Sequence, residues 1–304
     1  YEKAKIPTAR YHMVHDPEAA KEFIQEVGYP VIVKPNRGVG ACDTWKITNE
    51  QELEQFFRNL PSIPYIMEEF VPGEICSYDA IVNSKGTVLF ETGNVTPISI
   101  MDSVNNHGSI RFYIVDHVAE DLKAAGRACL KAFRVRSRFV HLEFFRLTED
   151  HPYLGPKGQV VGLEVNMRPS GGPTPDMVNF AYSTDCYQHY ADMMVYDKLR
   201  HQTKSTHCFC AYVGRWKELP YLHSHEEILT EFSDSLKLAQ ELPEVLAHGM
   251  GNYMYLAHLE SKEKMEEFFR YTLELCPPEP VKPARKPAAR NRKAPAKTTT
   301  KRKE

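Results

Sequence analysis

The sequence that decides the fold is GLEVNMRPSGG, residues 162–172. Within it Glu164 and Asn166 lie two positions apart, and in a β-strand this spacing places both side chains on one face. The apolar run 138–147 carries Glu143 and, with residues 159–166, predicts a long hairpin. Since cross-strand neighbours come within side-chain reach, we expect two carboxylates and an amide oxygen to gather on one sheet face.

This group of oxygen atoms predicts a cation site. Two carboxylates held this closely repel each other unless a cation lies among them. Oxygen ligands without a compact set of Cys or His select a hard cation, for which Mg²⁺ bridging phosphates is the usual case and Mn²⁺ the alternative. Arg168 then adds a fixed charge that suits a carboxylate or phosphate. An ordinary hairpin with outward-facing acids is the competing interpretation.

A second anion-binding pattern lies near the start of the chain. Lys34 ends the short β-branched run 31–34, and Gly38 and Gly40 follow in the next loop. Glycines let backbone N–H groups approach an anion closely. The loop matches neither the Walker pattern nor a dinucleotide fingerprint. Taken alone, Lys34 is equally explained as a lysine whose stem covers apolar surface.

The third pattern is the segment YIMEEFVPGE, residues 65–74. A strand that runs directly into Pro-Gly leaves backbone donors and acceptors free at its end, where a purine could use them. An acidic, solvated strand edge is the alternative interpretation.

Together these motifs resemble the ATP-grasp fold of carboxylate–amine ligases. The matching motifs, in the family's order, are Lys34, the Gly38/Gly40 loop, Glu68-Glu69-Phe70-Val71-x-Gly73-Glu74, His141-x-Glu143 and Glu164-x-Asn166-x-Arg168 followed by Gly171-Gly172. The resemblance covers about residues 5–200. It implies an α+β protein in which two α+β subdomains clamp ATP.

For the nucleotide, the resemblance implies contacts with the phosphates, the adenine and the ribose. Lys34 would contact the phosphates, and the loop with Gly38 and Gly40 would fold over them as a lid. Adenine would be held by the backbone at Glu69 and Val71 together with the Glu68 side chain. The Glu74 carboxylate would bind the ribose hydroxyls.

For the chemistry, the resemblance implies that Glu143, Glu164 and Asn166 ligate Mg²⁺ and that Arg168 steadies a reacting acyl phosphate. His141 stands where several relatives have Arg. A catalytic role for His141 and a packed, hydrogen-bonded histidine both stay open.

The implied activity is an ATP-dependent ligase that activates a small-molecule carboxylate as an acyl phosphate for attack by an amine. ADP and phosphate would be released and an amide formed. The alternatives are a carboxylase-type enzyme that uses bicarbonate, a non-catalytic ATP-binding protein, and a nucleic-acid-associated protein acting through its C-terminal tail. The family's preceding α/β domain and an earlier nucleotide-contacting lysine would lie before Tyr1, so we expect the chain either to be incomplete at its N-terminus or to be a degenerate member with a weakened grip on ATP.

The chain is long enough for one large or two modest domains. We expect an ATP-grasp domain over 1–205, a small C-terminal α+β unit over 206–276 and a disordered basic tail over 277–304. The expected helices are 17–27, a helix from Asn49, 117–133, 176–182, 185–200 and 261–275. The expected strands outside the 138–166 hairpin are 31–34, 44–47, 65–70, the hairpin 75–83 with 87–94, 207–214 and 253–259. Helical residues are expected between the last two strands, to about 247.

Charge and composition exclude several classes of protein. The tail holds ten Lys and Arg against two Glu, a net charge of +8, whereas residues 1–276 hold 28 basic and 38 acidic groups, a net charge of −10. An acidic body argues against a folded nucleic-acid-binding face, although weak anion or nucleic-acid contact through the tail stays open. No apolar run approaches the roughly 20 residues of a membrane helix. Scattered cysteines favour a reducing cytoplasm, and homo-oligomer formation stays open.

Overall fold

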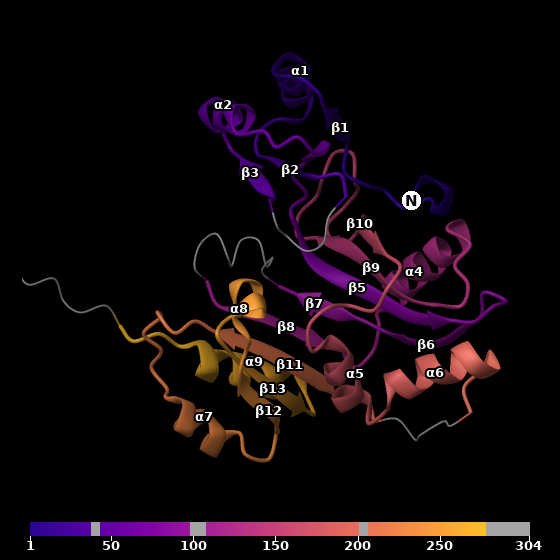
Figure 1. Ribbon diagram of the computed structural model, residues 1–304, viewed down its shortest axis with the longest axis vertical. Helices are drawn as coiled ribbons and strands as arrows, with labels where there is room; N and C mark the ends of the chain where they lie inside the picture. Colours follow the sequence, from indigo (N-terminus) through magenta and orange to yellow (C-terminus); the bar gives the residue numbers. More distant parts are fainter. Residues whose placement is uncertain (38–42, 98–107, 201–205, 278–304) are drawn as a thin grey trace, which may run out of the picture.

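The protein builds two antiparallel sheets, seen in a computed structural model that describes residues 1–37, 43–97, 108–200 and 206–277 (Figure 1). The predicted Gly38/Gly40 lid and all but the first residue of the predicted disordered tail lie outside the described residues. Within these ranges, none of the helices has both the length and the apolar character needed to cross a bilayer.

The small sheet has the strand order β1-β4-β2-β3. Its strands and the two helices on its outer face are β1 (Tyr11–Val14), α1 (Pro17–Val27), β2 (Val31–Pro35), β3 (Trp45–Ile47), α2 (Glu50–Arg58) and β4 (Tyr65–Glu69). Alternate strand residues, such as Val33 and Met67, face these helices and are fully buried. The intervening residues, among them Lys34 and Glu68, therefore face the large sheet.

Local chemistry explains where the helices of the small lobe begin and end. Asp16 caps α1 by accepting a hydrogen bond from the Ala19 amide at 2.8 Å, and Gly28 ends the helix at φ +79°. Asn49 caps α2 in the same way, as predicted. Glu52, three residues further on, accepts hydrogen bonds from the amide and the hydroxyl of Thr48.

The large sheet has the order β10-β9-β5-β7-β8-β11-β13-β12, with β6 paired to β5. Its strands are β5 (Gly73–Val82), β6 (Val88–Thr92), β7 (Asn94–Thr96), β8 (Ile110–Ile114), β9 (Arg138–Leu147), β10 (Val160–Asn166), β11 (Phe209–Arg215), β12 (Leu236–Glu241) and β13 (Tyr253–Leu259). The predicted hairpins of β5 with β6 and of β9 with β10 are both confirmed.

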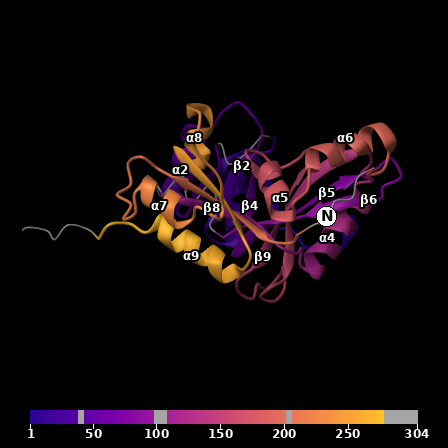
Figure 2. The ribbon, with the colours of Figure 1, turned by 90° about the horizontal axis from the view of Figure 1, so that it is seen from below.

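Helices cover both faces of the large sheet (Figure 2). One face carries α5 (Thr174–Tyr182) and α6 (Cys186–Tyr196), whose side chains form one apolar core with Ile81, Phe112 and Phe139. The other face carries α4 (Glu120–Ala132) and α9 (Lys262–Leu273). Among the residues that the structure describes, the remaining helices are a short 3-10 turn at Glu2–Ala4, α7 (His225–Glu231) and α8 (Glu244–Met250).

Four strands differ from the sequence-based expectations. Residues 236–241, expected to be helical, form β12 against β13. The strands β1, β7 and β8 were not predicted from the sequence. The strands β11, β12 and β13 continue the large sheet, because β11 pairs with β8. Residues 206–276 thus share a sheet with the rest of the chain, and the domain boundary at residue 205 stays a prediction.

Candidate functional site

Six polar side chains lie together on one face of the large sheet. The same face, at Ile81 and Phe139, is covered by α5 and α6. In the strand register, Glu164 lies opposite Glu143, which lies opposite Ser77. In the next row, Asn166 lies opposite His141, which lies opposite Asp79. Alternation along each strand turns all six side chains to one face. We call this set the polar block: Ser77, Asp79, His141, Glu143, Glu164 and Asn166.

Hydrogen bonds connect four members of the polar block, because Ser77 is also bonded to Asp79. The two ring nitrogens of His141 contact two carboxylates, with Nδ1 at 2.8 Å from Asp79 Oδ1 and Nε2 at 2.9 Å from Glu143 Oε1. Glu164 and Asn166 join these residues through the strand register, which sets Glu164 opposite Glu143 and Asn166 opposite His141. The three predicted metal ligands are thus brought together, although their role stays a prediction.

The charges of the block are set by its neighbours. Burial on its own lowers the pKa of His141, but the Asp79 carboxylate, followed by Glu143, raises this pKa to about 10. His141 is therefore an imidazolium at neutral pH, with an N–H for each carboxylate. Burial opposes ionisation of Glu143, yet the hydrogen bond and charge of His141 outweigh it and hold the pKa of Glu143 below its ordinary range. Burial and the nearby Glu143 charge raise the pKa of Glu164.

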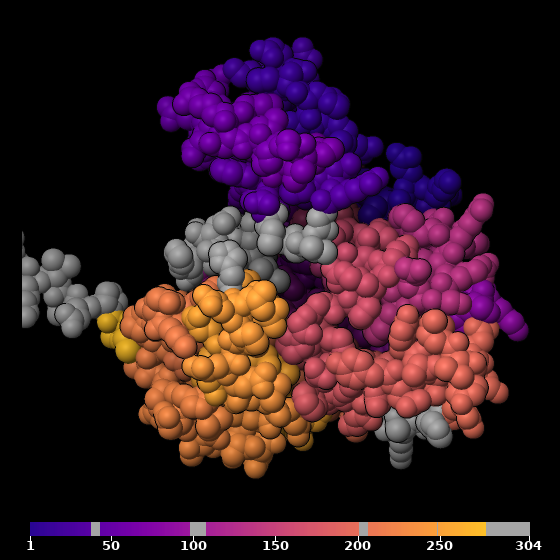
Figure 3. All heavy atoms as spheres, in the orientation of Figure 1, coloured from indigo at the N-terminus to yellow at the C-terminus, as the bar shows by residue number. Residues whose placement is uncertain are grey.

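Lys34 faces this block from the small sheet. Its ammonium lies 2.6 Å from Glu68 Oε2, on the inward face of the small lobe. The charge of the same ammonium offsets part of the rise in the pKa of Glu164 that burial and Glu143 cause. The molecular surface is hollowed between the two lobes (Figure 3). The sequence prediction that Lys34 approaches the acids of the 138–166 hairpin therefore agrees with the arrangement of the lobes.

The predicted adenine and ribose residues lie at the end of β4, in the connection after it and at the start of β5. The Glu69 carboxylate is buried and binds Arg10, whose backbone N and Nε each lie 2.8 Å from it. The Glu69 amide also donates to the Arg10 carbonyl oxygen at 3.0 Å. Val71 packs beside Leu147, and Glu74 is exposed. Arg10 thus occupies both the side chain and the backbone amide of Glu69. Neither group is free for the predicted contact with adenine.

Arg168 lies at the exit of β10. Its side chain is exposed and donates to the Pro169 carbonyl oxygen at 2.9 Å, while its charge lowers the pKa of Glu143. Gly171 and Gly172 lead from it into α5. Gly172 has φ +60°, which is the left-handed region that glycine adopts readily. Arg168 is thus near the acids but does not bind them, which leaves its guanidinium available to an anionic ligand.

The donor set suits a Mg²⁺ ion that keeps water and phosphate ligands better than it suits a metal ion held by protein groups alone. Across the described ranges, no three or more His, Cys, Asp and Glu side chains form a group that could hold a metal ion. The predicted set instead has two carboxylates and one amide. Mg²⁺ is usually bound through one or two carboxylates together with waters and substrate phosphates. The close approach of Glu143 and Glu164 also leaves negative charge for a cation to neutralise.

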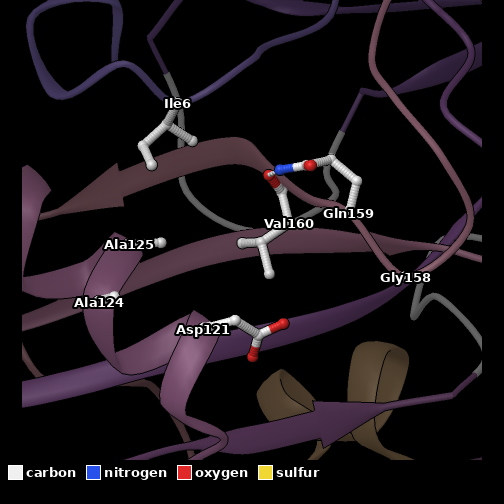
Figure 4. A pocket seen from close by; sticks show the side chains of 7 residues that line it. All are labelled: Ile6, Asp121, Ala124, Ala125, Gly158, Gln159 and Val160. Atoms are coloured by element: carbon white, nitrogen blue, oxygen red, sulfur yellow. Dashed lines mark hydrogen bonds between the residues drawn. The ribbon is translucent and has the colours of Figure 1, made fainter.

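A separate cavity of about 550 Å³ lies on the opposite face of the large sheet (Figure 4). It is lined by Ile6, Asp121, Ala124, Ala125, Gly158, Gln159 and Val160. Val160 and Ala125 belong to the apolar core beneath α4, so the sheet separates this cavity from the polar block. The cavity is therefore not part of the candidate site.

Sequence reasoning missed Ser77 and Asp79. Both lie in β5, more than 60 positions before His141, and only the pairing of β5 with β9 brings them beside it. One signal was available: two polar residues at alternate positions in the otherwise apolar run CSYDAIV, residues 76–82. Buried polar residues spaced in this way mark a polar strip on one face of a strand.

Comparisons with known proteins agree with this geometry. A family model of the ATP-grasp domain matches residues 1–130. The chloroplastic phosphoribosylamine–glycine ligase of Arabidopsis thaliana is 33% identical over 101 residues, which cover 30% of this chain and 18% of that protein. The formate-dependent phosphoribosylglycinamide formyltransferase of Sulfurisphaera tokodaii is 32% identical over 107 residues, which cover 32% of this chain and 26% of that protein. The matched segments thus span about a quarter or less of these relatives.

Solved structures show the same fold over most of the chain. N5-carboxyaminoimidazole ribonucleotide synthetase from Thermus thermophilus matches with a TM-score of 0.62 at 17% identity, covering 91% of this chain and 71% of that chain. L-amino acid ligase from Bacillus licheniformis matches with a TM-score of 0.63 at 15% identity, covering 88% and 68%. The chain therefore has the ATP-grasp fold. Its N-terminal part carries an ATP-grasp domain, and the resemblance inferred from the motifs is confirmed at this level.

Proposed function

We propose that the chain is an ATP-dependent ligase that activates a carboxylate as an acyl phosphate for attack by an amine. One observation carries the proposal: Lys34 pairs with Glu68 on the face of the small sheet that is turned toward the large sheet, where the strand register holds Glu143 opposite Glu164. A triphosphate held between the lobes would meet a cation from one side and a metal-binding acid pair from the other.

The Lys34–Glu68 pair supports a nucleotide site on the inward face of the small lobe. Lys34 pairs with Glu68 on the inward face of the small lobe. We propose that the Lys34 ammonium binds the phosphates and that Glu68, released from it, accepts a hydrogen bond from the adenine amino group. Glu74 would bind the ribose hydroxyls, and backbone groups at Glu69 and Val71 the purine edge. The proposed lid at Gly38 and Gly40 would exclude water.

Glu143, Glu164 and Asn166 would hold Mg²⁺, which, when bound, neutralises the phosphate oxygens during phosphoryl transfer. A carboxylate oxygen of the substrate then takes the γ-phosphoryl group, and ADP leaves. The amine nitrogen attacks the acyl carbon, the C–O bond to phosphate breaks, and the nitrogen loses a proton as the amide forms. Arg168 would stabilise the charge on the acyl phosphate with the guanidinium N–H groups that do not bond Pro169. No side-chain nucleophile is needed.

The solved relatives support more than one reaction of this type. One neighbour is named an L-amino acid ligase, which favours an amine acceptor. Another is the biotin carboxylase domain of a 2-oxoglutarate carboxylase from Hydrogenobacter thermophilus, described with MgADP and bicarbonate, which fits at a TM-score of 0.62 and 13% identity over 88% of this chain and 62% of that chain. A carboxylase-type reaction with bicarbonate is therefore the second candidate.

The proposal is tested by ADP release in bicarbonate-free buffer. We expect ADP to appear when Mg²⁺, an amino acid and an amine are present together, and hydroxylamine to trap the acyl phosphate as a hydroxamate. ADP release that needs bicarbonate instead would identify the carboxylase-type alternative. Tight ATP binding without turnover across a broad panel of carboxylates and amines would identify a non-catalytic nucleotide-binding protein.

A further inference from the structure

A chain of hydrogen bonds runs behind the acid pair, from β7 through β5 to β9. The Asn94 amide donates to Ser77 Oγ at 3.0 Å, and the Ser77 hydroxyl donates to Asp79 Oδ2. The other oxygen of Asp79 binds His141 Nδ1, and His141 Nε2 binds Glu143 Oε1. We call Ser77, Asp79 and His141 the buried chain. It ends on a proposed metal ligand.

The members of the buried chain cannot touch ATP or a substrate. Ser77, Asp79 and His141 are 0%, 4% and 5% exposed. The Glu143 side chain, by contrast, is 26% exposed. Glu143 is therefore the point at which the chain reaches the space between the lobes, and the other members can act on a ligand only through it.

The bonds of the chain fix how Glu143 is oriented. Both oxygens of Asp79 are occupied, one by Ser77 and one by His141, so the carboxylate cannot rotate without losing a hydrogen bond. Both nitrogens of the His141 ring are also occupied, which fixes the ring about its side-chain torsions. Glu143 Oε1 is thereby held, and its second oxygen is not engaged by the ring. Such chains also polarise their members along their length.

A purely structural network is the competing explanation. Buried ion pairs contribute little to the free energy of unfolding, because the loss of hydration offsets most of their attraction. Side chains that orient metal ligands, in contrast, are a regular feature of metal sites, and replacing them typically weakens metal binding by 10- to 100-fold. The position of the chain directly behind Glu143 and beside Glu164 favours this second use.

We propose that Asp79 and Ser77 are positioning residues that act through His141 to hold the Glu143 carboxylate for a nucleotide-bound divalent cation. This inference rests on the proposed function, since it needs Glu143 to bind the metal. It gives His141 a positioning role in place of the predicted catalytic one.

The test is the affinity for Mn²⁺, read from the electron paramagnetic resonance signal of free Mn²⁺ in the presence of a non-hydrolysable ATP analogue. Asp79→Asn keeps the shape of the side chain and should weaken Mn²⁺ binding about 10- to 100-fold. Ser77→Ala removes one neutral hydrogen bond and should weaken it about 5-fold. Asp121→Asn is the matched control. Asp121 pairs with Arg146 and lines the cavity on the far face of the sheet, so its loss should leave Mn²⁺ affinity unchanged.

A double variant distinguishes a positioning role of Asp79 from a loss of metal binding caused by misfolding. If Asp79 acts through His141, Asp79→Asn combined with His141→Gln should bind Mn²⁺ as weakly as His141→Gln alone. Thermal unfolding of each variant identifies losses that come from misfolding, and Ser77→Ala provides the mildest variant if Asp79→Asn does not fold. Variants that melt earlier but bind Mn²⁺ like the wild type would overturn this inference alone. A wild-type chain that binds no Mn²⁺ with the ATP analogue would overturn the proposed function as well.

Discussion

At the scale of single residues, the candidate site follows from the two-residue spacing of polar side chains in paired strands. The sequence alone placed Glu164 and Asn166 on one face and Glu143 on the partner strand, and the register of β9 with β10 agrees. It could not place Ser77 and Asp79 there. Their position depends on a strand pairing between distant segments, and no local pattern specifies which strands become neighbours.

Glu164→Gln tests the metal role at this scale. The substitution removes one ligand charge, and charge stabilisation by a bound metal is worth several kcal/mol, so Mg²⁺-dependent ADP release should fall by at least about 100-fold. The folded-state pKa of Glu164 is raised, so its ionisation opposes folding as the pH rises through that pKa. At neutral pH the glutamine variant should therefore melt no earlier than the wild type. Unaltered ADP release would show that Glu164 is not a metal ligand.

The control for this variant is Glu54→Gln. Glu54 is an exposed residue of α2 that pairs with Arg58 one helical turn away. The change removes the same carboxylate charge at a site far from the polar block, so ADP release should stay at the wild-type level.

At the scale of elements, local signals predicted helix ends and hairpins well but missed strands that depend on partners. The turn of the β5–β6 hairpin forms as the sequence indicates, with Asn83 accepting hydrogen bonds from the amides of Lys85 and Thr87. The segment LKLAQE at 236–241 consists of good helix formers, yet it pairs with β13 as the last strand of the described sheet. Tertiary pairing overrides helix propensity at such an edge.

Gly126→Ala tests how α4 packs on the sheet. A methyl group at Gly126 would collide with the Tyr78 ring, which is fully buried and whose hydroxyl binds Glu91 at 2.8 Å. Overpacking costs about 1–3 kcal/mol or more, whereas alanine gains about 1 kcal/mol in helix propensity. Because the ring has little room to move, the net effect should be a lower free energy of unfolding in urea.

The matched control is Gly249→Ala in α8. No neighbouring atom lies within 4 Å of the added methyl group there, so the variant should be as stable as the wild type or up to about 1 kcal/mol more stable. A Gly126→Ala protein that is equally stabilised would contradict the packing of α4 against Tyr78.

At the scale of the whole molecule, two connections join the lobes, residues 5–10 and 70–72. Arg10 in the first connection and Glu69, the residue before the second, are held together by an ion pair of 2.7 Å whose Glu69 side is buried. The ATP-grasp resemblance predicted two α+β subdomains, and the structure has two such lobes. The resemblance did not predict that β11, β12 and β13 extend the large sheet, because that continuity depends on the pairing of β8 with β11.

The central claim is that ATP is gripped between Lys34 and the acids of the large sheet, and calorimetric titration of ATP in the presence of Mg²⁺ tests it most directly. Hydrogen bonds to charged groups contribute about 1.5–3 kcal/mol, so Lys34→Ala should weaken ATP binding roughly 10- to 100-fold. Lys21→Ala, which breaks a similar Lys–Glu pair of 2.7 Å on the outer surface, should bind ATP like the wild type. Equal ATP affinity of Lys34→Ala and the wild type would contradict the account.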